Sequence, residues 1–543
     1  MRKKWMTAAG VTVLAFLFVI ALGFLEYKEK ETSGKLEKTV WHHEISKAAD
    51  PTVGSDTIPG DFLVDESFTS HLPLIVIDTQ GQEIMNYKYY DAETDSFRYR
   101  EGADPYSQIK IDVFDNEALK NTLSDTPSFS GNGKIKIRGN SSASLDKKQY
   151  RLQLQDSEGE KMKAPLLGMD PASEWILNGA QRDPTYMRNY LAYNLAHNLD
   201  SFSPEVRYCE VLKKAGDKYL YEGLYLLIEP IEQGPGRVDI AGYSPDRQQT
   251  SYIVRRDRED PDEQALLTYT AKTDISEIWS EEAGAPLQLG VVYPKAQKMT
   301  EASFQYIEND LSQIEEILYS SDPLVFLQYG DHIDVQSFID YFLLCEFTMN
   351  YDSGIYSTYM YKELGGKLKM GPYWDFDVGM DNNSRALTDF HHIVMRYRPY
   401  FDRLCRDEAF LNQMNKRYRQ LRDGILSDAY IQDALKETEH FLGKAIMRDR
   451  QRWKSSEPKL QKQVLTESET KLEVDRNRSG YEAEVRRMKD ALMLHGEYMD
   501  KHLYSELSPQ VNHAPVQFSF GGWLFIIAFF VSVILVQRYR KGD

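Results

Sequence analysis

Apolar and polar residues follow a strand-like pattern along much of the first half of the chain. In several segments they alternate with a period of two, and one segment is a short unbroken apolar run typical of a buried strand. The segments are residues 72–78, 108–114, 133–138, 149–155, 210–212 and 224–229. This pattern predicts a twisted antiparallel sheet within a β-rich part at residues 71–235.

Apolar residues at helical spacing occur in one segment of the first half of the chain and in several segments of the second half. Helices are predicted at residues 187–199, 303–319, 334–348, 405–446 and 463–504. Residues 243–290 are polar and irregular, and they are interpreted as a loop or insertion. A β-rich front part and a helical rear part at 300–505 together predict an α+β fold.

The N-terminus carries an uncharged apolar run at residues 5–25 behind Arg2, Lys3 and Lys4. About 20 such residues span a bilayer as a helix. A cleaved signal peptide has the same basic start, but the run is long and lacks a small-x-small cleavage site. Residues 1–27 are therefore predicted to be an uncleaved transmembrane anchor.

A second apolar run at residues 519–537 precedes a basic tail at 538–543. Basic residues flank both runs on the side of the chain terminus, so both termini are predicted to be cytoplasmic. The region between the runs is then extracytoplasmic. Its first part, residues 28–70, is charged and rich in turn residues, as in a stalk.

Composition narrows the functional classes. Hydrophobic residues make up 42% of the 543 residues, enough for a sizeable core. The net charge of −18 argues against nucleic acid as a partner, because phosphate backbones need a basic face. The three cysteines show no CxxC spacing and no histidine cluster, which argues against zinc and iron–sulfur sites.

Two short stretches place isolated acids at the ends of apolar, β-prone runs. They are Asn350–Asp352 and Tyr373–Asp377. A metal-dependent phosphoryl transferase needs one carboxylate to orient the attacking hydroxyl and another to hold Mg²⁺. The second stretch, with Asp375 and Asp377, is dense in the oxygen ligands that hard cations prefer. Aspartates in solvent-exposed turns would give the same sequence pattern.

A turn of small residues lies between two predicted strands. It consists of Arg138, Gly139, Asn140, Ser141 and Ser142. Exposed backbone N–H groups in such a turn can cradle phosphate oxygens, and the nearby Lys147 or Lys148 can neutralise their charge. An ordinary hairpin has the same residues.

Arg188 lies in the first turns of the predicted helix that follows Asp183-Pro184, where Asp183 is expected to be the N-cap. An arginine there can pair with Glu229 or reach a phosphate group. The spacing does not decide between these partners.

Taken in order, these segments resemble the spore coat protein H (CotH) kinase family of atypical protein-kinase-like enzymes. The resemblance covers residues 70–505. The matching segments are Leu72–Thr79, Ile137–Ser142, Lys147–Tyr150, Trp175–Asn178, Asp183–Asn189, Glu222–Glu229, Asn350–Asp352 and Trp374–Asp377.

The resemblance implies roles for the acids. Asp352 would orient the acceptor hydroxyl, Asp375 would hold Mg²⁺ or Mn²⁺, and Asp377 would be a second ligand. Kinases carry an asparagine five residues after the catalytic aspartate, and Ser357 stands there in this chain. A serine hydroxyl also binds Mg²⁺, so an active enzyme and an inactive kinase-like protein both remain open.

The resemblance also implies a nucleotide site. The turn at 138–142 would cover the phosphates of ATP, and a lysine would bind them. Strand alternation points Lys147 and Lys148 to opposite faces, and Lys148 is the preferred nucleotide ligand. Glu229 is the predicted partner of that lysine.

The predicted function is that of a membrane-anchored, extracytoplasmic atypical protein kinase. It would transfer the γ-phosphoryl group of Mg- or Mn-ATP to serine or threonine of cell-surface or spore-coat-type proteins. One alternative is a catalytically inactive module with a structural role in the cell envelope. Another is a phosphotransferase that acts on a cell-wall polymer.

Overall fold

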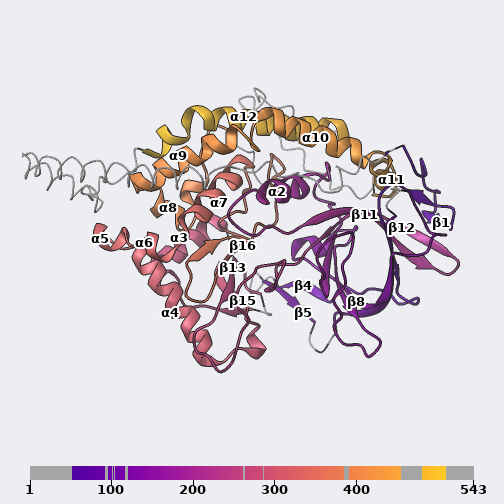
Figure 1. Cartoon of the computed structure of the whole chain (residues 1–543), viewed down its shortest axis with the longest axis horizontal. Helices are drawn as coiled ribbons and strands as arrows, with labels where there is room; N and C mark the ends of the chain where they lie inside the picture. Colours follow the sequence, from indigo (N-terminus) through magenta and orange to yellow (C-terminus); the bar gives the residue numbers. More distant parts are fainter. Residues whose placement is uncertain are drawn as a thin grey trace, which may run out of the picture. The chain divides into compact units, whose positions relative to one another are not determined.

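The computed structural model describes residues 50–508, apart from several gaps (Figure 1). The gaps are 51, 92–95, 101, 103, 117–119, 261–262, 285, 384–389 and 454–479. The predicted anchor at 1–27, the predicted C-terminal span at 519–537 and the basic tail lie outside the described residues. Within the described ranges, no helix combines the length and the apolarity that crossing a membrane requires.

The β-rich part is built on a sheet of eight strands in the order β1-β12-β10-β9-β8-β6-β3-β11. A further pairing of β11 with β12 joins the two sides of this sheet. All neighbours run antiparallel except β11 and β3. The strands are β1 (Leu63–Val64), β3 (Leu74–Asp78), β6 (Ser107–Phe114), β8 (Phe129–Ile137), β9 (Tyr150–Gln155), β10 (Glu174–Asn178), β11 (Val206–Ala215) and β12 (Lys218–Ile228).

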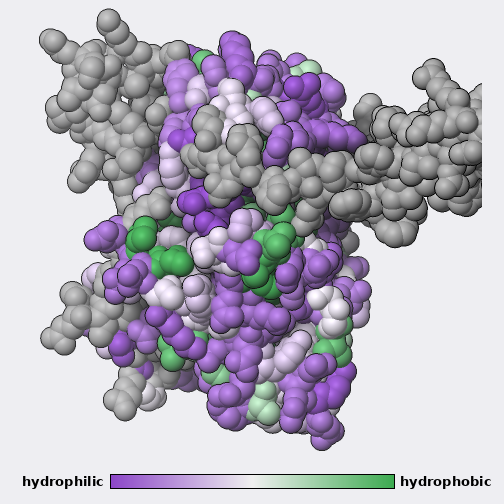
Figure 2. Space-filling model, turned by 90° about the vertical axis from the view of Figure 1, so that its left-hand side faces the viewer, coloured by the Kyte–Doolittle hydropathy of each residue, from purple (hydrophilic) through white to green (hydrophobic). Residues whose placement is uncertain are grey.

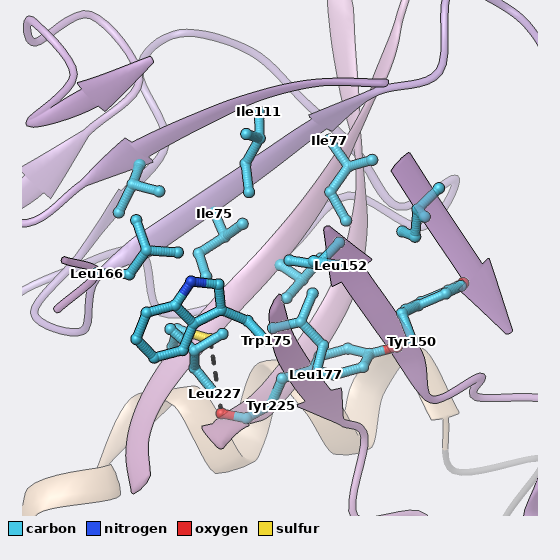
Figure 3. Close-up of a cluster of buried hydrophobic side chains, with 14 of the residues drawn as sticks. Ile75, Ile77, Ile111, Tyr150, Leu152, Leu166, Trp175, Leu177, Tyr225 and Leu227 are labelled. Carbon is cyan, nitrogen blue, oxygen red and sulfur yellow. Dashed lines mark hydrogen bonds between the residues drawn. The ribbon is translucent and has the colours of Figure 1, made fainter. Parts of the chain in front are cut away.

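The main core of this part is enclosed by the sheet (Figure 3). Trp175 is wholly buried there, with Ile111, Leu152, Leu177 and Leu227 around it. Every second residue of β6 and β9 points into this core, which explains the period of two in the sequence. The prediction of a β-rich N-terminal part is confirmed.

Two small two-stranded sheets accompany the large one. They pair β2 (Thr69–Ser70) with β7 (Asn121–Thr122), and β4 (Lys88–Asp91) with β5 (Ser96–Tyr99).

The second half of the predicted stalk differs from the prediction, because residues 58–70 pack into the fold. Ile58, Val64 and Phe68 are buried in a second apolar cluster, and β1 pairs with β12. Residues 28–49 of the stalk lie outside the described residues.

A second sheet of five strands has the order β14-β15-β13-β16-β17. Its strands are β13 (Tyr252–Asp257), β14 (Gln264–Ala265), β15 (Gln288–Tyr293), β16 (Thr358–Lys362) and β17 (Leu368–Met370). Residues 243–290, predicted to be an irregular insertion, therefore include the central strand of this sheet and α3 (Asp274–Ala283). Some of the charged residues of this segment pair with one another: Arg255 forms ion pairs with Asp260 and Glu263.

Helices dominate the rest of the chain, as predicted. The longer ones are α2 (Arg188–Ala196), α4 (Glu301–Leu318), α7 (Val335–Phe347), α9 (Glu408–Arg422), α10 (Asp428–Leu442), α11 (Lys444–Trp453) and α12 (Tyr481–Leu507). The short ones are α5 (Pro323–Phe326), α6 (Tyr329–His332) and α8 (Phe401–Leu404). Helix α7 is buried along most of its length and contacts α9 and α12.

Helix α11 joins the helical part to the large sheet by packing against β12. Two buried ion pairs hold it there. Arg448 pairs with Glu210 of β11 (Nη2–Oε2, 2.6 Å), and Asp449 pairs with Lys147 (Oδ1–Nζ, 2.6 Å).

The face drawn in Figure 2 is mostly hydrophilic, with apolar side chains in separate small groups. The main candidate site among the described residues is a charged cavity.

Candidate functional site

A polar cavity of about 580 Å³ brings together residues of both sheets and of the segment that follows α7. Lysine and arginine outnumber aspartate and glutamate in its lining, although the whole chain carries a charge of −18. The size falls within the range of roughly 300–1,000 Å³ that is typical of small-molecule sites. Such a cavity is suited to an anionic ligand.

Asp352 lies in the lining of this cavity. The loop that carries it connects α7 to β16. Its backbone carbonyl accepts hydrogen bonds from Ile355 N (3.0 Å) and Tyr356 N (2.7 Å). This turn fixes the backbone, so that the carboxylate stands at the cavity wall.

Asp375 lines the same cavity and has a left-handed backbone with φ of 63°. Non-glycine residues rarely adopt this conformation, so the surroundings must hold it. The Asp375 N–H donates to the Tyr193 hydroxyl (3.2 Å), and its carbonyl accepts from Asn350 Nδ2 (3.0 Å). Helix α2 and the loop after α7 thus position the residue together.

Burial raises the pKa of the Asp375 carboxyl, and neighbouring Asp257 raises it further, whereas the positive charge of Arg138 lowers it. Burial also raises the pKa of Asp377 well above its usual value, with Asp375 as the next cause. Crowded, partly buried carboxylates of this kind are stabilised by a bound cation.

The predicted phosphate turn also faces the cavity. Arg138, Gly139, Asn140 and Ser142 line it, and Ser141 begins a short 3₁₀ helix that ends at Ser144. The Arg138 Nη1 donates to Gln149 Oε1 (3.0 Å), and its guanidinium lies 5.6 Å from the centre of the Trp374 ring. These contacts hold a positive charge opposite Asp375.

The two predicted lysines lie elsewhere. The Lys147 Nζ is buried and donates to Asp449 Oδ1 (2.6 Å) and to the Leu224 carbonyl (2.7 Å). The Lys148 Nζ donates to the Ala143 carbonyl (3.1 Å). Neither lysine is among the described residues that line the cavity, whereas Arg138 is.

Arg188 and Glu229 are also outside the cavity lining. Arg188 is completely buried and pairs with Asp183 (Nη1–Oδ1, 2.5 Å). It also donates to the carbonyls of Gly379 (Nε, 3.1 Å) and Met380 (Nη2, 3.2 Å). Arg188 therefore supports the segment just after Asp377 instead of reaching a phosphate.

Glu229 forms a buried ion pair with Arg237. Its N–H donates to the Glu205 carbonyl (3.1 Å), and its Oε2 accepts from Glu205 N (3.0 Å). Burial raises its pKa to about 7. The structure does not bring it to Lys148.

Asp257 and Arg182 are among the cavity residues that were missed from the sequence. Asp257 is the last residue of β13, and its Oδ2 accepts from Ser357 N (3.2 Å) and Ser357 Oγ (3.4 Å). Its sequence signal was weak, because two arginines separate it from the apolar run Tyr252–Val254. Arg182 also lines the cavity, and its positive charge lowers the pKa of Asp375 and Asp377.

The donor set fits a hard divalent cation. Within the described ranges, no three His, Cys, Asp or Glu side chains converge on one metal position. The Ser357 Oγ, however, lies 3.4 Å from Asp375 Oδ2. Asp377 lines the same cavity and adds a second carboxylate. A few protein oxygens, completed by phosphates and water, are the shell that Mg²⁺ prefers.

Comparison with protein-family models gives a match. The family model described as CotH kinase protein matches residues 135–499, which is most of the chain. The matched region runs from β8 into α12 and contains all the cavity residues discussed above. No curated protein matches the chain.

Proposed function

The chain belongs to the CotH kinase family, and on that premise we propose that it transfers the γ-phosphoryl group of ATP to serine or threonine hydroxyls. The observation that carries the proposal is the meeting of Arg138, Asp352, Ser357 and Asp375 at one cavity. Phosphoryl transfer depends mainly on positioning and on charge neutralisation, and this arrangement offers both.

Each residue has a distinct part in the proposed reaction. Asp352 accepts the proton of the acceptor hydroxyl while the hydroxyl oxygen bonds to the γ-phosphorus. The bond between the γ-phosphorus and the bridging β–γ oxygen breaks, and ADP leaves. Arg138 neutralises phosphate charge from the side of the large sheet.

Asp375, Asp377 and Ser357 would hold Mg²⁺ or Mn²⁺ at this site. When bound, the cation neutralises the charge of the nucleotide phosphates. Arg188 acts as a positioning residue, because its hydrogen bonds fix the carbonyls of Gly379 and Met380 behind Asp377.

The proposed setting is the outer side of the cell membrane. The support is in the sequence, where basic residues flank the apolar runs at 5–25 and 519–537 on the side of each terminus. The proposed acceptors are cell-surface or spore-coat-type proteins.

A labelling experiment tests the transfer directly. The full chain, purified in detergent, is incubated with Mn²⁺ and ATP labelled at the γ-phosphate, with a surface-protein extract as acceptor. We expect labelled phosphoserine or phosphothreonine, and a loss of labelling of at least about 100-fold for Asp375→Asn. The control is Asp112→Asn, which removes the same charge from β6, outside the cavity lining. Equal labelling by the wild type and Asp375→Asn would contradict the proposal.

One observation favours the inactive alternative: Ser357 stands where kinases carry asparagine. That alternative predicts that Mg-ATP does not raise the melting temperature and that no label is transferred. A label found on wall polymer, and absent from protein, would favour the polymer phosphotransferase.

A further inference from the structure

The side chain of Ser357 lies between two carboxylates from distant parts of the chain. Its Oγ is 3.4 Å from Asp257 Oδ2 at the end of β13 and 3.4 Å from Asp375 Oδ2. A hydroxyl has one proton and can donate to only one of these oxygens at a time. The Ser357 Oγ and the other carboxylate oxygen then have no proton between them. A cation would stabilise this arrangement.

The spacing of these oxygens suits neighbouring ligands of one cation. In an octahedral shell, adjacent oxygens are separated by about 3.0 Å for Mg²⁺ bonds of roughly 2.1 Å, and by about 3.3–3.7 Å for the longer bonds of Ca²⁺. The two observed separations of 3.4 Å lie at this scale. Ser357 Oγ is therefore spaced from each carboxylate oxygen as neighbouring ligands of one cation are.

The surroundings hold Asp257 in this position. Its Oδ1 accepts from Arg258 N (2.8 Å), and its Oδ2 lies 3.6 Å from Arg255 Nη1. The residue is 6% exposed, and that small exposed part belongs to the cavity wall. On the other side of the site, Asn350 holds the backbone of Asp375, because its Nδ2 donates to the Asp375 carbonyl (3.0 Å).

We propose that Asp257 is a cation ligand that, together with Ser357, replaces the metal-binding asparagine of other kinases. The proposal rests on the proposed function. It names a residue outside the loop between α7 and β16 that carries Asp352. The missing asparagine is then no sign of lost metal binding, because a carboxylate from the second sheet supplies the oxygen.

Manganese affinity tests this assignment without any turnover. The full chain in detergent is titrated with Mn²⁺ in the presence of a non-hydrolysable ATP analogue, and free Mn²⁺ is followed by electron paramagnetic resonance. We expect Asp257→Asn to weaken Mn²⁺ binding by about 10- to 100-fold. Asp112→Asn removes the same charge from β6, outside the cavity lining, and serves as the matched control.

A second variant tests the replacement itself. Ser357 has a φ of 47°, which asparagine tolerates better than most residues. We expect Ser357→Asn, added to Asp257→Asn, to restore most of the lost affinity. Unchanged binding by Asp257→Asn, or a loss that Ser357→Asn does not repair, would overturn the inference while the proposed function stands. A wild-type chain that binds no Mn²⁺ would overturn both.

Discussion

Replacing Lys147 with methionine tests whether this lysine stabilises the fold or binds the nucleotide. The Lys147 Nζ forms a buried ion pair with Asp449 and also donates to the Leu224 carbonyl. Removing one partner of such a pair costs about 3–5 kcal/mol, because the other charge stays buried. Asp449 retains hydrogen bonds from Leu224 N (2.7 Å) and the Tyr186 hydroxyl (2.9 Å). We therefore expect a loss near the lower end, about 3 kcal/mol.

Two measurements on the same preparation decide the question. Urea unfolding gives the free energy of unfolding, and calorimetric titration gives the affinity for Mg-ATP. Lys147→Met should lower the free energy of unfolding. At a temperature where the variant is folded, it should leave the affinity for Mg-ATP unchanged. Lys148→Met is the control, and it should change stability by at most about 1 kcal/mol because its Nζ has one carbonyl partner. Loss of Mg-ATP binding with unchanged unfolding would refute this reasoning.

Three further variants test the cavity. Arg138→Met should weaken Mg-ATP binding about 10- to 100-fold, because a charge-assisted contact is worth roughly 1.5–3 kcal/mol; calorimetric titration checks this, and unchanged affinity would exclude Arg138 as a phosphate ligand. Asp352→Asn should lower kcat by about 10²–10⁴-fold with little change in Mg-ATP affinity, and a variant with wild-type kcat would exclude it as the base. Gly139 has a φ of 100°, and a Cβ there would meet the Ser142 side chain, so Gly139→Ala should lower the free energy of unfolding by about 1–3 kcal/mol; wild-type stability in urea would show that the turn does not need glycine.

The local pattern of apolar and polar residues was sufficient to predict much of the β-rich part. Strands β6 and β9 follow directly from a period of two, because one of their faces is buried throughout. The pattern failed at β13, where an apolar run of three residues, Tyr252–Val254, is followed by charged residues. Those charges looked solvated, yet Arg255 is satisfied by acids of its own segment.

The candidate site was also predicted only in part. Asp352 and Asp375 could be selected as isolated acids at the ends of apolar runs, and they lie at one cavity. Arg138 was predicted as part of the phosphate turn, but the preferred basic residue, Lys148, is not in the cavity lining. The direction of a side chain near a turn depends on distant packing, which the local sequence does not reveal. Lys147 points to Asp449, about 300 residues further along the chain, whereas Arg138 is held toward Trp374.

The most direct test of the central claim is the position of a bound nucleotide. A structure of the full chain with Mn²⁺ and a non-hydrolysable ATP analogue would locate the metal by its anomalous scattering. We predict manganese between Ser357 and Asp375, phosphates against Arg138, and the γ-phosphate on the side of Asp352. A nucleotide bound against Lys148, or a cavity that stays empty at saturating analogue and manganese, would contradict the account.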